Sequence, residues 1–290
     1  MSVRQYLNAA LAAALSSLFV MTAGQAAEAL PPIRHVFVIV LENEGYEQTF
    51  GPQSPAPYLA HTLTAEGALL TQYFGTGHAS LDNYLAMISG QAATPETRAD
   101  CRIFGDFVQT GTTADGQAVG HGCVYPASIK TLADQLSAAG LDWRGYMEDM
   151  GNDPKRGAAT SCGHPPIGAV DLTQRAAVDD QYAARHNPFV YFHSIIDSAD
   201  CGRHVVRLEQ LATDLQSPAT TPAFSFITPN LCHDGHDEPC RNGEHGGLES
   251  ADQFLKQWVP IVTNAPAFKA DGLLIVTFDE SDASSRIAKA

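Results

Sequence analysis

The sequence predicts a single α/β domain with a mostly parallel central sheet. Two nearly continuous apolar runs, at 33–41 and 272–278, are typical of parallel strands that are buried on both faces. Segments whose apolar residues recur at helical spacing alternate with such runs, and no linker or internal repeat divides the chain. The length of 290 residues is sufficient for one large domain, which we place at 28–290.

The first 27 residues resemble a secretory signal. Arg4 supplies the positive start, an apolar run follows, and small residues at 24–27 offer a cleavage site. The alternative is an uncleaved N-terminal anchor, although the run is short and rich in alanine for a membrane span. We therefore expect a periplasmic or secreted protein without a stable membrane span, since no later stretch approaches 18 apolar residues.

Net charge and cysteine content indicate which partners and which compartment the protein has. Removal of the signal changes the net charge from −15 to −16, and no Lys/Arg run is present, so nucleic acid is not an expected partner. All six cysteines follow the signal, and an even number in an oxidising compartment predicts disulfides. The spacings are unlike those of a zinc knuckle. Pairing in sequence order closes local loops and is favoured: 101–123, 162–201 and 232–240.

The remaining elements follow from local patterns. Helical spacing of apolar residues predicts helices at 57–67, 128–140, 203–215 and 251–262. Gly140 provides a stop signal for the second of them. Apolar stretches between these helices predict strands at 68–74, 143–147 and 223–228. Residues 92–126 are rich in Gly, Thr and Asp and predict a loop insertion that is held by Cys101 and Cys123.

Ser80 lies just ahead of an apolar segment with helical periodicity. The apolar positions are Leu81, Tyr84, Leu85 and Ile88. The spacing predicts that Ser80 sits at or near the N-terminus of a helix, where unpaired N–H groups and the helix dipole favour a phosphate and an attacking alkoxide. The simpler alternative is that Ser80 only caps the helix.

Polar residues follow the predicted buried strands. They are Glu42 and Asn43 after 33–41, and Asp279 and Glu280 after 272–278. In an open parallel sheet, ligands bind beyond the carboxyl ends of the strands, so these four residues are expected to converge. Clustered carboxylates need a cation, and oxygen ligands suit Mg²⁺, Ca²⁺ or Mn²⁺ better than Zn²⁺. The alternative for each acid is an N-cap of the next helix.

Histidines and a polar loop supply further candidates. The loop 229–237 contains Asp234 and His236, which are suited to phosphate or metal, and a Cys232–Cys240 bridge would hold it rigid. The alternative is a solvated loop around a structural disulfide. His78 is a candidate base, phosphate donor or packing residue, and His186 is a candidate phosphate ligand or the start of a strand.

Four motifs in order carry a family resemblance: VFVIVLEN, HASLDNYLAMISG, FITPNLCHDGHD and LLIVTFDESD. Together they resemble the bacterial phosphoesterase family of secreted phospholipases C, acid phosphatases and phosphatidylinositol-3-phosphatases, within the alkaline phosphatase superfamily. The resemblance implies a three-layer α/β/α sandwich. It also implies Ser80 as nucleophile and Asn83 as donor to a phosphoryl oxygen, with Asp234 and His236 near the phosphate. It implies metal ligation by Glu42, Asn43, Asp279 and Glu280.

The predicted function is therefore exported, metal-dependent hydrolysis of phosphomonoesters through a phosphoserine on Ser80. His236 is the expected general acid, and His78, His186 and Asp234 the expected phosphate ligands. The expected partner is a small phosphorylated substrate or a phospholipid headgroup. Alternatives are a phospholipase C-type diesterase and a truncated, non-catalytic secreted relative. The latter arises because family members continue for several tens of residues beyond the position of Glu280, whereas this chain ends ten residues after it.

Overall fold

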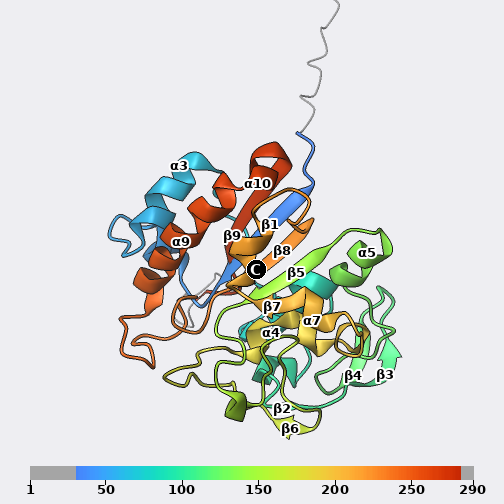
Figure 1. Cartoon of the computed structure of the whole chain (residues 1–290). Coiled ribbons are helices and arrows are strands. Elements are labelled where there is room, and N and C mark those ends of the chain that lie inside the picture. Colours follow the sequence, from blue (N-terminus) through green and yellow to red (C-terminus); the bar gives the residue numbers. More distant parts are fainter. Residues whose placement is uncertain (1–30, 282–290) are drawn as a thin grey trace, which may run out of the picture. The chain divides into compact units, whose positions relative to one another are not determined.

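Five parallel strands form the central sheet in the order β7-β5-β8-β1-β9 in the computed structural model, which describes residues 31–281 (Figure 1). Their bounds are β1 His35–Leu41, β5 Trp143–Met147, β7 Val205–Arg207, β8 Phe224–Thr228 and β9 Gly272–Phe278. All four pairings are parallel, which confirms the predicted sheet. The prediction that the run 272–278 is buried on both faces is wrong, because β9 is an edge strand and Leu273 and Ile275 are 41% and 40% exposed. The predicted signal at 1–27 and the last nine residues lie outside the described part of the chain.

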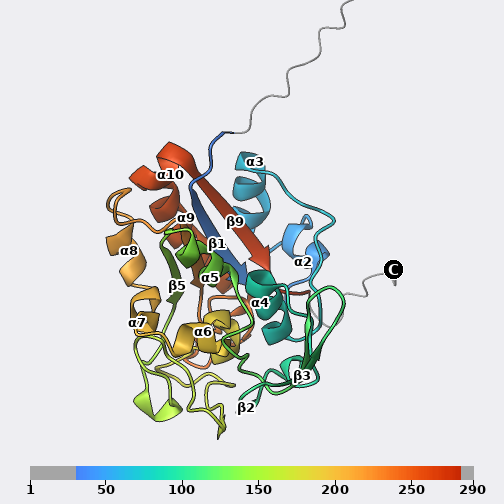
Figure 2. The ribbon, with the colours of Figure 1, turned by 90° about the vertical axis from the view of Figure 1, so that its right-hand side faces the viewer.

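Helices cover both faces of this sheet, as Figures 1 and 2 show. Along β1, Phe37, Ile39 and Leu41 join one core, whereas Val40 joins the other, because successive strand side chains point to opposite faces. The first core receives side chains from η1 (Tyr58–Leu63), α8 (Gln210–Asp214), α9 (Gly247–Asn264) and α10 (Pro266–Asp271). The second receives them from α4 (Ser80–Ser89), α5 (Leu132–Ala138) and η5 (Pro188–Tyr191). The predicted α/β sandwich is confirmed.

The helix α4 shows how local sequence sets an element's ends. It begins at Ser80, with Ala79 in an extended conformation at the N-cap position. It ends at Ser89 and is followed by Gly90, whose φ of 67° lies in the left-handed region that glycine adopts most easily. Leu81, Tyr84 and Leu85 are buried, so the helical periodicity of the sequence corresponds to the face that packs on the sheet.

Two predicted elements are wrong. Residues 68–74 form no strand, and Leu70 and Tyr73 are 71% and 63% exposed, because no described strand pairs with this segment. Residues 203–215 are not one helix. Val205–Arg207 forms β7, which pairs with β5, so tertiary pairing prevails over the helical spacing of this segment.

The insertion at 92–126 contains short elements. A hairpin joins β3 (Val108–Thr112) to β4 (Ala118–His121), and β2 (Ile103–Phe104) pairs with β6 (Ala169–Val170). The other helices are α2 Tyr46–Phe50, α3 Thr64–Glu66, η2 Thr97–Ala99, η3 Pro154–Arg156, η4 Ala184–His186, α6 His193–Ile196 and α7 Cys201–His204. Among the described residues, no helix has the length and apolar character needed to cross a bilayer.

All six cysteines form disulfides, and the pairing is the predicted one. The bridges are Cys101–Cys123, Cys162–Cys201 and Cys232–Cys240. They close loops with sequence separations of 22, 39 and 8 residues. Local pairing in sequence order therefore holds throughout the chain.

Candidate active site at the carboxyl ends of the strands

Two buried acids meet beyond the carboxyl ends of β1 and β9. Leu41 is opposite Phe278 in the strand register. Glu42 and Asp279 are the residues that follow the two strands, and they therefore lie side by side. Glu42 is 0% and Asp279 is 3% exposed. The backbone N–H of Asn43 donates to Asp279 Oδ1 at 3.4 Å and fastens the two strand ends together.

Ser80 points into this acidic site. Its hydroxyl donates to Glu42 Oε2 at 2.8 Å, rather than capping the N–H groups of its own helix. Ser80 itself is buried, since it is only 4% exposed. The structure thus brings the predicted nucleophile and one predicted metal ligand into direct contact.

A second contact extends from Glu42 to His186 and Asp234. His186 Nε2 is 3.3 Å from Glu42 Oε1, and its Nδ1 is 3.1 Å from Asp234 Oδ2. All three residues are buried, and each offers a ligand atom within 4.8 Å of the other two, so they form a potential metal-binding group. Tyr84 from α4 stacks on the His186 ring, with ring centroids 5.1 Å apart, and holds its orientation.

Burial controls the protonation of these groups. Burial raises the pKa of Glu42 well above its usual value, and the charges of Asp279 and Asp234 raise it further. Burial, followed by the charge of Glu280, raises the pKa of Asp279 to about 7. Burial likewise lowers the pKa of His186 well below its usual value. Like-charged carboxylates that share a buried site favour protonated forms unless a cation is present.

Several buried polar atoms of the site have no hydrogen-bond partner among the described residues. They are Glu42 Oε1, Asp279 Oδ2 and His186 Nε2. The first and the last of these lie 3.3 Å apart, but without the geometry of a hydrogen bond. Buried polar atoms are normally satisfied, so such a cluster indicates a ligand. Two carboxylate oxygens and an imidazole nitrogen are appropriate donors for a divalent cation. The donor set therefore fits a metal.

The other two predicted metal ligands lie at the rim of the site. Asn43 Nδ2 donates to Glu42 Oε2 at 3.2 Å, and its φ of 54° turns the chain sharply at the end of β1. Glu280 Oε2 contacts His78 Nδ1 at 2.9 Å. The side chain of His78 is 59% exposed, so this predicted phosphate ligand stands at the surface.

Asn83 makes hydrogen bonds within the loop that precedes Ser80, and its role as a donor to a phosphoryl oxygen stays a prediction. Its Oδ1 accepts hydrogen bonds from both N–H and Oγ1–H of Thr76 and from Gly77 N–H. Its Nδ2 donates to the carbonyl groups of Gly77 and Ala79. Since both ends of the amide are engaged, Asn83 holds the loop 76–79 that leads into Ser80.

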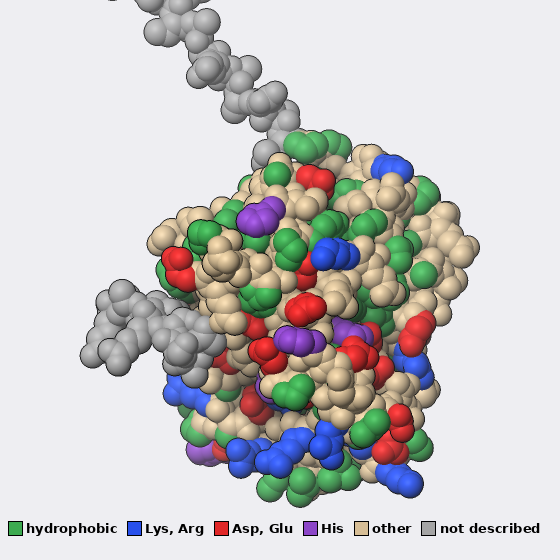
Figure 3. Space-filling view, turned by 90° about the vertical axis from the view of Figure 1, so that its left-hand side faces the viewer, with side chains coloured by type: hydrophobic (Ala, Val, Ile, Leu, Met, Phe, Trp, Pro, Cys, Tyr) green, Lys and Arg blue, Asp and Glu red, His purple; other side chains and the backbone are tan. Residues whose placement is uncertain are grey.

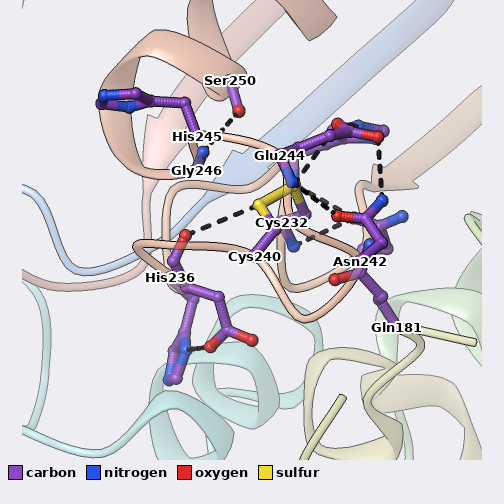
Figure 4. Close-up of a disulfide and its surroundings, with 12 residues drawn as sticks. Gln181, Cys232, His236, Cys240, Asn242, Glu244, His245, Gly246 and Ser250 are labelled. Atoms are coloured by element: carbon purple, nitrogen blue, oxygen red, sulfur yellow. Dashed lines mark hydrogen bonds and ion pairs between the residues drawn. A yellow bond between two sulfur atoms is a disulfide. The ribbon is translucent and has the colours of Figure 1, made fainter. Parts of the chain in front are cut away.

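The loop between Cys232 and Cys240 carries the last two predicted residues, Asp234 and His236. Figure 4 shows this disulfide and His236. Asp234 Oδ1 accepts from the backbone N–H of His236 at 2.8 Å, and His236 Nδ1 lies 2.8 Å from Asp237 Oδ1. The ring centroids of His236 and His186 are 6.0 Å apart. The structure thus brings Asp234 and His236 to the same site as Glu42 and Ser80. Figure 3 shows carboxylates and imidazoles gathered near the middle of one face of the molecule.

His233 anchors this loop to two glutamates. His233 Nδ1 is 2.9 Å from Glu148 Oε1, and its Nε2 is 3.2 Å from Glu244 Oε2. Although burial opposes the charge, hydrogen bonds and charge from the two glutamates raise the pKa of His233 to about 9. Glu148, which follows β5, also accepts from the backbone N–H of Asn230, so the loop is tied to the sheet.

Sequence reasoning overlooked Arg185. This residue lies on η4 beside His186 and is 4% exposed. Its guanidinium donates to the carbonyl of Gln174 at 3.1 Å and lies 3.2 Å from His236 Nε2. The only signal in the sequence is its position next to His186, which is a candidate phosphate ligand.

Comparison with known proteins gives a family match. A sequence model of the Phosphoesterase family matches residues 54–284. A phosphate-repressible acid phosphatase of Penicillium chrysogenum is 29% identical over 77% of this chain and 43% of its own length. A phosphatidylinositol-3-phosphatase of Mycobacterium tuberculosis is 28% identical over 91% of this chain and 69% of its own length. A probable acid phosphatase of Kluyveromyces lactis is 23% identical over 86% of this chain. The chain spans slightly less than half the length of the two acid phosphatases.

Proposed function

Because the chain belongs to the phosphoesterase family, we propose that it is an exported, metal-dependent hydrolase of phosphomonoesters that uses Ser80 as its nucleophile. The observation that carries this proposal is the 2.8 Å hydrogen bond from Ser80 Oγ to Glu42 Oε2 inside a buried acidic site. A hydroxyl in such a position has a proton acceptor aligned with it before substrate arrives. The acid phosphatase relatives support the monoester as substrate. The predicted signal and three disulfides support export.

The chemistry assigned to the residues is in-line transfer. Ser80 Oγ attacks phosphorus and passes its proton to Glu42 Oε2, while the bond to the leaving oxygen breaks. His236 supplies the proton that the departing alkoxide needs. Water then attacks the phosphoserine, the bond from phosphorus to Oγ breaks, and Ser80 regains a proton. Positioning and charge stabilisation account for most of the catalysis in phosphoryl transfer.

Glu42 and Asp279 are the residues that would hold the metal ion. Their unpartnered buried oxygens support this assignment, and Asn43 and Glu280 adjoin them in the chain. His186 and Asp234 extend the donor set on the other side of Glu42. When bound, a divalent cation lowers the pKa of a neighbouring hydroxyl and neutralises charge on phosphoryl oxygens. The predominance of oxygen donors favours Mg²⁺, Ca²⁺ or Mn²⁺.

The test is hydrolysis of p-nitrophenyl phosphate by the purified, oxidised protein. The rate is measured with Mg²⁺, Ca²⁺ or Mn²⁺ and again after treatment with chelator. A parallel assay uses the diester bis(p-nitrophenyl) phosphate as substrate. Ser80→Ala is expected to lose at least about a thousandfold in kcat, since triad-type nucleophiles lose that much or more on removal. Ser89→Ala is the matched control, because Ser89 lies at the other end of the same helix and its hydroxyl contacts only the backbone, where it donates to Leu85 O and accepts from Gln91 N–H.

The outcomes separate the alternatives. Turnover that is lost with chelator and with Ser80→Ala supports the proposal. Turnover that survives Ser80→Ala refutes the nucleophile, and a preference for the diester would favour a phospholipase C-type enzyme. A folded protein that hydrolyses neither compound would indicate a non-catalytic relative.

A phosphoinositide 3-phosphate is the second candidate substrate. The phosphatidylinositol-3-phosphatase relative is matched over 91% of this chain. The exposed apolar side chains Leu70, Tyr73 and Phe74 directly precede Gly75, which packs against the carbonyl of Asp279. Exposed apolar patches beside a site are suited to lipid. Release of phosphate from phosphatidylinositol 3-phosphate vesicles, at a higher rate than from p-nitrophenyl phosphate, would support this candidate.

A further inference from the structure

Arg185 is a buried cation without an acidic partner among the described residues. Arg156, which is buried to a similar degree, pairs with Asp180 at 2.5 Å, and the less buried Arg144 pairs with Asp214. No carboxylate of residues 31–281 lies within ion-pair distance of Arg185. Buried arginines are almost always paired, so this exception needs an explanation.

The Arg185 guanidinium contacts a backbone carbonyl and an imidazole. The carbonyl of Gln174 accepts at 3.1 Å, and His236 Nε2 lies 3.2 Å from the other terminal nitrogen. A carbonyl fixes the position of the side chain without neutralising its charge. The buried positive charge therefore remains available to an anion that enters the site.

The charge of Arg185 acts on the site itself. It lowers the pKa of both Glu42 and Asp234, in opposition to their burial. Arg185 also precedes His186, whose ring touches those two carboxylates. The short helix η4 therefore carries both the guanidinium of Arg185 and the imidazole of His186.

We propose that Arg185 binds the non-bridging oxygens of the phosphoryl group that Ser80 attacks. This inference rests on the proposed function, and it assigns a residue to the substrate phosphate. A guanidinium presents parallel N–H groups that match two phosphate oxygens, which the point charge of a lysine does not.

The contact with His236 places the guanidinium beside the predicted general acid. His236 Nδ1 lies 2.8 Å from Asp237 Oδ1, while its Nε2 lies 3.2 Å from the Arg185 guanidinium. A phosphoryl group that is held by Arg185 would therefore lie next to this imidazole.

The experiment measures orthophosphate binding by isothermal titration calorimetry, with the oxidised, metal-loaded protein. Arg185→Ala is expected to weaken the Kd for phosphate about 10- to 100-fold, the size expected for loss of a charged hydrogen bond. Arg185→Lys keeps the charge without the fork and should weaken binding to a smaller extent. Arg203→Gln is the matched control, since this side chain is 56% exposed and pairs with Asp142 away from the site. Added guanidinium ion should partly restore phosphate binding to Arg185→Ala, which a merely structural role does not predict.

The outcomes for Arg185 are independent of turnover. Weakened binding in Arg185→Ala with rescue by guanidinium supports the proposal even if p-nitrophenyl phosphate is not hydrolysed, in which case the proposed function alone fails. If Arg185→Ala does not fold, weaker binding in Arg185→Lys is the supporting result. Unchanged phosphate affinity in a folded Arg185 variant overturns the proposal, and so does a wild-type protein that binds no phosphate.

Discussion

Removal of two of the disulfides, one at a time, should affect stability and activity in opposite order. Cys162–Cys201 closes a separation of 39 residues and Cys232–Cys240 one of 8 residues. Loop-closure entropy gives about 3.9 kcal/mol of stabilisation for the first and about 2.5 kcal/mol for the second. Replacing each pair with alanine should therefore destabilise the protein more at 162–201 than at 232–240.

Activity should follow the opposite order. The 232–240 bridge holds the loop that carries Asp234 and His236, whereas the 162–201 bridge lies beside β7, where Cys162 N–H donates to Val205 O. Loosening the first loop disperses groups that must be placed within fractions of an ångström, so kcat/KM should fall at least about tenfold. The 162–201 variant, assayed where it remains folded, should retain kcat/KM within about twofold.

The assay combines urea unfolding with hydrolysis of p-nitrophenyl phosphate for both double variants. Urea unfolding supplies the free energy of unfolding, and turnover is measured at a temperature at which both variants are folded. A 232–240 variant that loses stability but keeps full activity would refute the view that this bridge positions the site. An equal loss of activity in both variants would show a general effect on the fold instead.

Three further predictions test particular contacts. Asn83→Asp retains the oxygen that accepts from the loop 76–79, so its rate of p-nitrophenyl phosphate hydrolysis should exceed that of Asn83→Ala. Equal losses of rate in the two variants would instead favour a donor role toward phosphate. His233→Asn should destabilise the protein at pH 6 and have little effect near pH 10, as measured by urea unfolding. The raised folded-state pKa of about 9 gives a contribution that is complete below the unfolded pKa and lost as pH rises through 9. A pH-independent difference would contradict this origin. Leu255→Ala, at a fully buried position of α9, should lower the free energy of unfolding by about 2–5 kcal/mol. Ile261→Ala, at a position 39% exposed on the same helix, should lower it by less than half as much. Similar losses in the two variants would argue against the packing of α9.

The acidic centre of the site could be predicted from sequence because continuous apolar runs are a strong local signal for parallel strands. The runs that form β1 and β9 are continuous and end abruptly in acids. Parallel strands place their carboxyl ends at one edge, so Glu42 and Asp279 follow from topology without any knowledge of side-chain contacts. Family motifs added Ser80, and its contact with Glu42 agrees with that addition.

Other features depend on pairing between distant segments. Val205–Arg207 has helical spacing with its neighbours, and only the neighbouring strand β5 makes it a strand. Residues 68–74 have the composition of a strand, but strands need partners, and the described chain provides none for them. Arg185 was overlooked because nothing in a linear pattern distinguishes a buried arginine from an exposed one.

The balance of charge at the site connects these observations. Glu42, Asp234 and Asp279 are buried acids in a protein whose formal net charge is −15, so a phosphate approaches a region that repels it. Burial raises the pKa of each of the three acids, and repulsion from neighbouring carboxylates raises it further. A divalent cation at Glu42 and Asp279 would offset the carboxylates, while the guanidinium of Arg185 would face the phosphate from the side of His186. On this reasoning neither positive charge replaces the other. Loss of the metal should therefore leave part of the phosphate affinity in place, and that remainder should depend on Arg185.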